Sequence, residues 1–312
     1  MSRLAYLFPG QGAQAVGMGK AFYDASDEAR EVYRKANARL GFDVTALCLE
    51  GPPEELTKTE KCQPAIFTTS LAAFAAFLRR APASLQPVGG AGLSLGELTA
   101  LAAAKAFSLE DGFYLIKARG EAMAACAVQS KGAMLALIGL PADEVEAVCR
   151  ESGAWGANYN TPEQVVLSGA VEAIEKAESL AKARGAKRAI RLEVAGAFHS
   201  PLMQPAADAF KAALAKVELR APVFPVISNA AAKPTQDPLQ IRELLVKQIV
   251  SPVLWEPSMR ALIQAGATAT VEFPPSRVLT GMLRKIDGSV KGMTVDEPSD
   301  LETVLEWLKN LS

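Results

Sequence analysis

The sequence predicts an α/β fold in which helices cover both faces of a mostly parallel sheet and a ferredoxin-like subdomain is inserted. Short apolar segments alternate with helical patterns along most of the chain, an order typical of parallel sheets. Between residues 131 and 197 the order becomes strand–helix–strand–strand–helix–strand, which is the ferredoxin-like pattern. The 312 residues suffice for one large or two smaller domains. We therefore expect a larger domain over residues 1–130 and 198–312, with the subdomain at 131–197.

The first elements follow from local signals. Residues 4–8 are apolar and stop at a Pro-Gly pair, which predicts a strand followed by a loop. From Gln63 onward, apolar residues recur with a helical period. A glycine-rich segment then leads into an Ala- and Leu-rich helical pattern. Ser108, followed by Asp111, resembles a capping box and predicts the start of another helix.

The remaining elements are expected as follows. Within the insertion, strands are expected at residues 134–140, 155–160, 164–168 and 188–194, and helices at 141–152 and 171–184. Pro141 in the first turn of one helix and Gly185 after the other are typical boundaries. Beyond the insertion, helices are expected at 201–217, 239–249, 257–265 and 300–311, and strands at 224–228 and 269–273.

Composition excludes several classes of function. The net charge of −1 gives no strong field to attract nucleic acid or an anionic membrane, and 50% hydrophobic residues indicate a globular protein. The apolar segment 71–78 is too short to span a bilayer, and the first residues lack the pattern of a secretory signal. The four cysteines form no C-x-x-C and the chain has one histidine, so a metal site is not expected. We expect a cytoplasmic protein with reduced thiols.

Ser94 is the first candidate for chemistry, because residues 92–96 match G-x-S-x-G. The pattern alone is weak, but here it follows a glycine-rich approach and opens a helical pattern, where a nucleophile elbow lies. The free N–H groups of a helix start favour developing negative charge. The alternative is a plain glycine-rich turn.

His199 is the only imidazole that could activate such a serine. The order of serine before histidine agrees with the hydrolase type. A lone histidine is usually structural, and no acidic residue close to it in sequence is an obvious third member of a triad. Glu193 lies upstream and Asp208 lies on the next expected helix. A distant aspartate or a backbone carbonyl could equally orient the ring.

Two further positions could bind substrate. Gln11 lies in the loop after the first expected strand, and its N–H could pair with that of Leu95 to form an oxyanion hole. Arg119 could present its planar guanidinium to a carboxylate. The alternatives are a simple turn for Gln11 and a solvated helix charge for Arg119.

Taken together, these segments resemble the malonyl-coenzyme A:acyl carrier protein transacylase family, the acyltransferases of fatty-acid and polyketide synthesis. The resemblance covers nearly the whole chain. It rests on FPGQGAQ at 8–14, QPA at 63–65, GLSLGE at 92–97, KARG at 117–120, NYNTPEQVVLSG at 158–169, GAFHSPLM at 196–203, KQIVSPV at 247–253 and VLTGMLRKI at 278–286. Their combination in this order is highly specific.

The resemblance implies a hydrolase-like α/β domain with the ferredoxin-like insertion, and it implies roles for the candidate residues. The family's nucleophile falls on Ser94, its base on His199 and its carboxylate-binding arginine on Arg119. The backbone carbonyl that orients the histidine falls at Gln248, so the resemblance implies a Ser–His dyad rather than a triad.

The oxyanion donors of the family fall on Gln11 and Leu95, and Phe198 before the histidine favours malonyl over methylmalonyl units. Two positions depart from the family pattern. Leu93 stands where the family commonly has histidine, and Phe-Pro-Pro at 273–275 stands where it tends to have Gly-Pro-Gly. Proline cannot copy the backbone freedom of glycine, so the shape of that loop is expected to differ.

The implied activity is transfer of a malonyl group from malonyl-coenzyme A to the phosphopantetheine thiol of acyl carrier protein in fatty-acid synthesis. It would pass through a malonyl-serine and need no metal or redox cofactor. The alternatives are a trans-acting acyltransferase of polyketide synthesis, a serine thioesterase or esterase, and a catalytically silent scaffold. An acidic carrier protein could contact a basic cluster in the insertion, although such clusters are usually solvated surface. The cluster comprises Lys182, Arg184, Lys187, Arg188 and Arg191.

Overall fold

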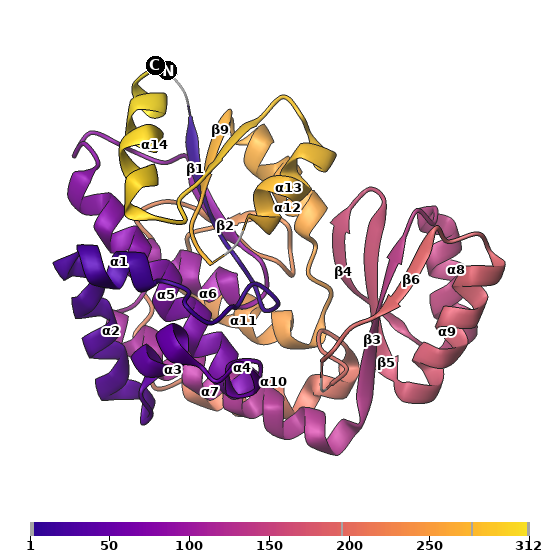
Figure 1. Ribbon diagram of the computed structural model, residues 1–312. Helices are drawn as coiled ribbons and strands as arrows, with labels where there is room; N and C mark the ends of the chain where they lie inside the picture. The colour runs from indigo at the N-terminus through magenta and orange to yellow at the C-terminus, as the bar shows by residue number, and fades with distance from the viewer. Residues whose placement is uncertain (1–2, 195, 276, 311–312) are drawn as a thin grey trace.

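The computed structural model describes residues 3–194, 196–275 and 277–310, which form a larger and a smaller β-sheet, each with its own helices (Figure 1). The larger sheet has the strand order β10-β9-β1-β2-β7-β8. These strands are β1 (Leu4–Phe8), β2 (Gly89–Gly92), β7 (Val226–Ile227), β8 (Pro234–Thr235), β9 (Ala269–Glu272) and β10 (Lys291–Thr294). Neighbouring strands are parallel except for β8, which runs antiparallel to β7. The prediction of a mostly parallel sheet is confirmed.

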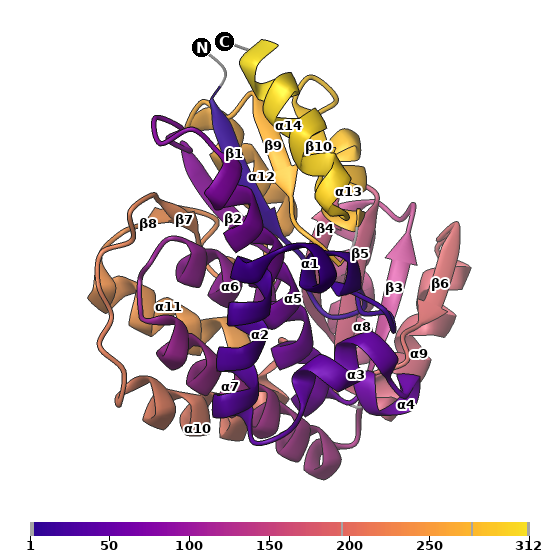
Figure 2. The same ribbon diagram turned by 60° about the vertical axis from the view of Figure 1, so that its left-hand side comes forward.

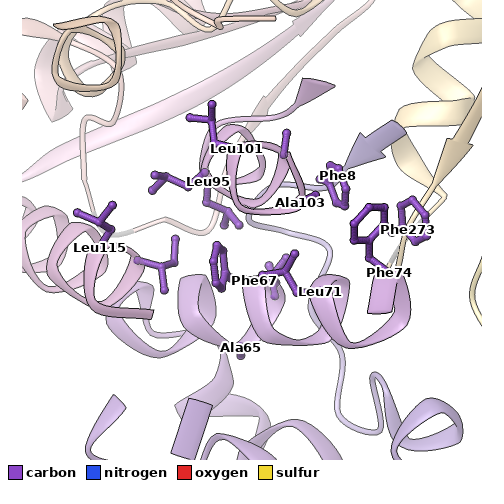
Figure 3. Close-up of a cluster of buried hydrophobic side chains, with 14 of the residues drawn as sticks. Phe8, Ala65, Phe67, Leu71, Phe74, Leu95, Leu101, Ala103, Leu115 and Phe273 are labelled. Carbon is purple, nitrogen blue, oxygen red and sulfur yellow. The ribbon is translucent and has the colours of Figure 1, made fainter. Parts of the chain in front are cut away.

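Strand β1 lies at the centre of the larger sheet and is buried on both faces. Because side chains alternate along a strand, Tyr6 and Phe8 enter one apolar cluster while Ala5 and Leu7 enter the other. Figure 3 shows the first cluster, in which Phe8 lies beside Phe74 and Phe273. A strand with two buried faces reads as a continuous apolar run, which explains why the sequence identifies residues 4–8 so clearly.

The helices around the larger sheet divide between these two clusters. The first cluster takes side chains from α2 (Asp27–Leu40), α3 (Val44–Glu50), α5 (Thr59–Arg80), α6 (Leu95–Ala103), α7 (Leu109–Ser130), α10 (Gln204–Leu214), α11 (Pro238–Val250) and α14 (Pro298–Asn310). The second takes side chains from α12 (Trp255–Gln264) and α13 (Val278–Ile286). The short helices α1 (Lys20–Ala25), α4 (Pro53–Leu56) and η1 (Pro201–Met203) complete this part. None of the helices in the described residues is long and apolar enough to cross a membrane.

The smaller sheet has the order β4-β5-β3-β6, and its neighbouring strands are all antiparallel. It consists of β3 (Gly132–Ile138), β4 (Trp155–Thr161), β5 (Gln164–Ala170) and β6 (Arg188–Arg191), with α8 (Ala142–Ser152) and α9 (Val171–Ala183). Leu135 and Leu137 pack beneath these two helices, whereas Met134 and Ala136 join the core of the larger part. Figure 1 shows α8 and α9 on the side turned away from the larger sheet, and Figure 2 shows the smaller sheet beside the larger part from a second direction. The predicted ferredoxin-like insertion is confirmed.

Backbone hydrogen bonds join the smaller sheet to the segment that follows α11. The N–H of Tyr159 on β4 donates to the carbonyl of Val253 at 2.9 Å, and the N–H of Val253 donates to the carbonyl of Ala157 at 2.8 Å. Both β4 and the segment that follows α11 are therefore fixed at the junction. We propose that the domain division lies at residues 131–197, as expected from the sequence.

Several predicted boundaries differ from the structure, and the backbone explains most differences. Strand β3 begins earlier than expected and stops before Gly139, whose φ of 74° is incompatible with an extended strand. Pro141 is the N-cap of α8 rather than part of its first turn. Strand β7 contains only two residues and begins after Pro225, which has no N–H to donate to a neighbouring strand. Strands β2, β8 and β10 and helices α1 to α4 and α13 were not predicted.

Candidate active site

Ser94 lies in a sharp turn between the end of β2 and the start of α6, with φ 53° and ψ −105°. This conformation is strained for a residue with a side chain, and strain of this kind clusters at functional sites. The flanking glycines permit it. A Cβ on Gly92 would lie 2.0 Å from the backbone of Gly96, and a Cβ on Gly96 would lie 2.3 Å from the carbonyl oxygen of Phe8. The turn therefore places Ser94 at the N-cap of helix α6.

His199 faces this serine. Its Nε2 lies 2.8 Å from Oγ of Ser94, and its Nδ1 lies 2.9 Å from the backbone oxygen of Gln248. A carbonyl oxygen can only accept, so Nδ1 carries the proton and Nε2 is left with the lone pair. The Ser94 hydroxyl therefore donates to Nε2. The pair has the geometry of a nucleophile and its general base, with a backbone carbonyl in the orienting position.

Arg119 reaches the same serine from the middle of α7. The residue is 1% exposed, and its guanidinium donates to Oγ of Ser94 at 3.0 Å. It also donates to the side-chain oxygens of Gln63 at 2.6 Å and Gln248 at 2.8 Å. Two neutral amides thus hold a buried cation beside the nucleophile. A buried charge with neutral partners is costly, which makes the position attractive to an anionic ligand.

Burial sets the protonation of the site. Desolvation, aided by the positive charge of Arg119, lowers the pKa of His199 to about 4, so the imidazole is neutral at physiological pH. Desolvation lowers the pKa of Arg119 to about 10, against the opposing charge of Glu97, and the guanidinium stays protonated. Burial raises the pKa of Glu97 to about 7. A neutral base and a permanent cation therefore flank Ser94.

The three side chains open onto a cavity of about 430 Å³ between the two sheets. The larger domain contributes Gln11, Leu93, Leu95 and Phe198, and the insertion contributes Met134 and Asn158. Leu95 is the first residue of α6, where helix N–H groups lack partners within the helix. All seven residues assigned from the sequence therefore lie in or directly behind one cavity.

Three residues of this site were missed from the sequence. Gln63 holds Arg119, Glu97 accepts a hydrogen bond from Gln248, and Asn229 accepts one from the N–H of Ser94 at 2.8 Å. Gln63 and Glu97 belong to the QPA and GLSLGE motifs, so membership of a motif could have identified both as site residues. Asn229 lies two residues after the end of the two-residue strand β7, and no motif marked it.

The two departures from the family pattern have local explanations. Leu93 packs against the second apolar cluster and lines the cavity. Phe273 is fully buried and stacks on Phe8, with ring centroids 5.3 Å apart. The carbonyl of Pro274 accepts a hydrogen bond from the Ser70 hydroxyl. The Phe-Pro-Pro loop is thus anchored by packing rather than by glycine backbone.

The basic cluster of the insertion is largely paired with acidic side chains. Arg184 contacts Glu144 and Glu151, and Arg191 contacts Glu175 and Glu178. Lys182 and Lys187 also lie within ion-pair distance of glutamates. Because these charges are balanced locally, the cluster offers less net attraction to an acidic partner than the sequence suggests. Its role in contacting a carrier protein stays a prediction.

Comparison with known proteins places this geometry in a family. The family model described as "Acyl transferase domain" matches residues 5–301. The malonyl CoA-acyl carrier protein transacylase of Bacillus subtilis is 40% identical, covering 99% of this chain and 98% of that protein. The Escherichia coli protein of the same name is 37% identical, covering 98% and 100%.

Solved structures agree with the sequence relatives. An acyl-carrier-protein-S-malonyltransferase from Bartonella henselae superposes with a TM-score of 0.95 at 38% identity, over 98% of this chain and 99% of that one. A malonyl-transacylase in complex with a type II PKS acyl-carrier protein gives a TM-score of 0.94 at 36% identity, over 98% and 99%. With a serine, a neutral imidazole and a buried guanidinium at one cavity, the chain belongs to the malonyl CoA-acyl carrier protein transacylase family.

Proposed function

We propose that this protein transfers a malonyl group from malonyl-coenzyme A to the phosphopantetheine thiol of acyl carrier protein, in fatty-acid synthesis. The observation that carries the proposal is the buried guanidinium of Arg119, 3.0 Å from the Ser94 hydroxyl that also donates to His199. A fixed cation at this distance suits an acyl group with its own carboxylate. The names of the relatives point to the same substrate and acceptor.

In the first half-reaction, Ser94 Oγ attacks the thioester carbonyl carbon while Nε2 of His199 takes the hydroxyl proton. The N–H groups of Gln11 and Leu95 donate to the oxyanion that forms. The carbon–sulfur bond then breaks, and the imidazolium returns the proton to the departing thiolate. A malonyl-serine ester remains, its carboxylate held by Arg119.

In the second half-reaction, the phosphopantetheine thiol gives its proton to His199 and its sulfur attacks the ester. The ester C–O bond breaks and Ser94 recovers the proton. No oxidation state changes, and the side chains supply nucleophile, base and charge, so we infer that the reaction needs no metal or redox cofactor. Phe198 lines the cavity and is assigned to selection of malonyl over methylmalonyl units.

We further infer a cytoplasmic protein that binds neither nucleic acid nor membrane. The net charge of −1 supports the second part. The free cysteines support the first, since buried Cys48, Cys62 and Cys126 carry no disulfide. The relative in complex with a type II PKS carrier protein keeps polyketide synthesis as the second candidate pathway.

A single-turnover experiment separates transfer from hydrolysis. The purified chain is acylated with labelled malonyl-coenzyme A, freed of excess substrate, and mixed with either buffer or holo acyl carrier protein. We expect the label to move to the carrier protein much faster than it is released into buffer. Release as free malonate at the same rate in both mixtures would identify a serine thioesterase instead.

A further inference from the structure

Glu97 is a buried carboxylate that the proposed reaction does not use, although it lies on the helix that begins directly after Ser94. The residue is 2% exposed, and burial raises the pKa of its carboxyl group. Burying a carboxylate is unfavourable unless its oxygens accept hydrogen bonds. The donors that satisfy Glu97 therefore indicate what the residue does.

One oxygen of Glu97 joins two segments that are far apart in the sequence. Its Oε2 accepts from the backbone N–H of Asn229 at 2.9 Å and from the side-chain amide of Gln248 at 2.6 Å. Asn229 follows β7, and Gln248 lies on α11. The carboxylate thus ties the elbow helix to both neighbours through a single acceptor.

These two neighbours hold the backbone on both sides of the nucleophile. Oδ1 of Asn229 accepts from the N–H of Ser94 at 2.8 Å, and its Nδ2 donates to the carbonyl of Gly92 at 2.9 Å. The Gln248 amide donates to the carbonyl of Ser94 at 3.0 Å. The strained φ of 53° at Ser94 is therefore supported by the two side chains that Glu97 fixes.

Gln248, which Glu97 holds in place, also contacts the other two residues of the site, Arg119 and His199. Its Oε1 accepts from Arg119 at 2.8 Å, and its backbone oxygen accepts from His199. Oε2 of Glu97 accepts from the Asn229 N–H, so the NH₂ end of the Gln248 amide is the end that can face the same oxygen. The oxygen end is then left facing the guanidinium, and a flipped amide would place oxygen against oxygen.

We propose that Glu97 is a positioning residue for acyl transfer: by binding Asn229 and Gln248 through one oxygen, it holds the Ser94 backbone and orients the groups that contact His199 and Arg119. The inference rests on the proposed function only in taking Ser94 as the nucleophile. The function of Glu97 depends on the position of its acceptor oxygen and not on its charge. A neutral amide oxygen at the same place would accept the same hydrogen bonds from Asn229 and Gln248 and serve nearly as well.

Three substitutions test this, with the second-order rate of Ser94 labelling by an alkyl fluorophosphonate as the readout. Glu97→Gln keeps an acceptor oxygen in place, and its new NH₂ can donate to the adjacent Ser228 hydroxyl. Glu97→Asp keeps the charge but withdraws the oxygen by one methylene. Because misplacement by about 1 Å can cost about 100-fold, we expect losses within about 3-fold for Gln, about 10-fold or more for Asp and about 100-fold for Ala.

Glu272 provides the matched control. It is also a fully buried glutamate, and it accepts backbone N–H bonds from Leu279 and Thr280 at the start of α13. Glu272→Ala and Glu272→Gln report the effect of lost stability alone, with thermal melting measured for every variant. We expect Glu272→Ala to keep the labelling rate within about 3-fold at a melting temperature comparable to that of Glu97→Ala.

Either of two results would overturn the proposal. The first is Glu97→Asp labelling as fast as Glu97→Gln or faster, and this pair decides even if Glu97→Ala fails to fold. The second is an equal loss in the two alanine variants at matched stability. The fluorophosphonate reports the reactivity of the free Ser94 hydroxyl, which does not depend on which acyl group the enzyme transfers. A wild-type protein that reacts with the fluorophosphonate at Ser94 but takes no malonyl group from malonyl-coenzyme A would therefore refute the proposed function. The inference about Glu97 would remain valid in that case.

Discussion

At the scale of single residues, the Ser94 hydroxyl is oriented before any substrate binds. Arg119 donates to Oγ, which leaves the hydroxyl hydrogen to point at Nε2 of His199. The proton of His199 is held on Nδ1 by the carbonyl of Gln248. These three hydrogen bonds agree with only one placement of the protons, with hydrogen on Nδ1 of His199 and a lone pair on Nε2. The imidazole is therefore in the tautomer that can take the serine proton.

Arg119 is expected to set the preference for a charged acyl group. Arg119→Ala should reduce kcat/KM for malonyl transfer by about 100-fold, because a bidentate charge-assisted pair contributes about 2–3 kcal/mol. Transfer of acetyl, which has no carboxylate, should fall by less than about 10-fold on the same grounds. Both rates can be measured by acyl-enzyme formation from the two coenzyme A thioesters. Equal losses for the two substrates would remove the assigned role.

The lowered pKa of His199 predicts an unusual pH profile. Protonation of Nε2 would remove the acceptor for the Ser94 hydroxyl, so kcat/KM should fall as the pH drops through about 4, the value of the folded protein. An exposed histidine would cause this loss near its ordinary pKa of about 6.5. The measurement is the rate of acyl-enzyme formation between about pH 3 and 8.

Glu97 also titrates within this pH range, because burial raises the pKa of its carboxyl group to about 7. Replacing it by glutamine therefore shows which of the two groups causes the acidic fall in rate. In Glu97→Gln the acidic fall should remain near pH 4, since it belongs to His199. An acidic fall centred near the ordinary histidine value in both proteins would contradict the assignment.

At the scale of elements, the turn between β2 and α6 places the nucleophile. Gly96 packs its Cα against the carbonyl of Phe8, so α6 approaches β1 more closely than any residue with a side chain allows. This contact fixes the start of α6, and with it the position of Leu95, which lines the cavity. The strand, the turn and the helix thus behave as one rigid support.

Gly96→Ala should therefore damage both stability and reactivity. Its Cβ would lie 2.3 Å from a backbone oxygen, and overpacking of this kind costs about 1–3 kcal/mol. Gly281→Ala is the control, because that helical glycine has open space around its Cβ position and should gain up to about 1 kcal/mol. Urea unfolding and Ser94 labelling measure the two effects. Similar free energies of unfolding for the two variants would contradict this account.

At the scale of the whole molecule, the cavity lies where the two sheets meet, and the junction is fastened by backbone hydrogen bonds between β4 and Val253. One face of the smaller sheet also joins the core of the larger part through Met134 and Ala136. Shared core and shared hydrogen bonds favour unfolding of both sheets in one cooperative transition.

Tryptophan fluorescence tests this cooperativity. Trp155 lies on β4 of the smaller sheet, Trp255 lies in the second core of the larger part, and Trp307 lies on α14. In two variants that keep only Trp155 or only Trp255, with phenylalanine at the other two positions, the urea midpoint from fluorescence should coincide with the midpoint from far-UV circular dichroism of the same variant. Separate midpoints for the two probes within the Trp155 variant would show that the insertion unfolds on its own.

The sequence predicted those parts of the fold that have local signals. Strand β1 is an uninterrupted apolar run, and the alternation of Met134 and Ala136 with Leu135 and Leu137 marks a sheet with two buried faces. Strand β10 lacks such a signal, because it is half-exposed and exists only through its pairing with β9. The residues with which β10 pairs lie on β9, too far away in the sequence for a local pattern to reveal the pairing.

The site shows the same division. Ser94 and His199 stand in motifs with a recognisable chemical reason, whereas the role of Asn229 arises only when β7 brings it beside the elbow. Gln63 and Glu97 lie within recognised motifs, but their partners, Arg119 and Gln248, come from other helices. Polar networks of this kind are set by tertiary structure and cannot be read from spacing.

The most direct test of the account is to locate the acyl group by mass spectrometry. The full chain is mixed with malonyl-coenzyme A in the absence of carrier protein, digested and mapped. We expect one malonyl group on the peptide that contains Ser94, no adduct in Ser94→Ala, and loss of the adduct on addition of a pantetheine thiol. A malonyl group on a different residue, or an adduct that persists in Ser94→Ala, would contradict the central claim.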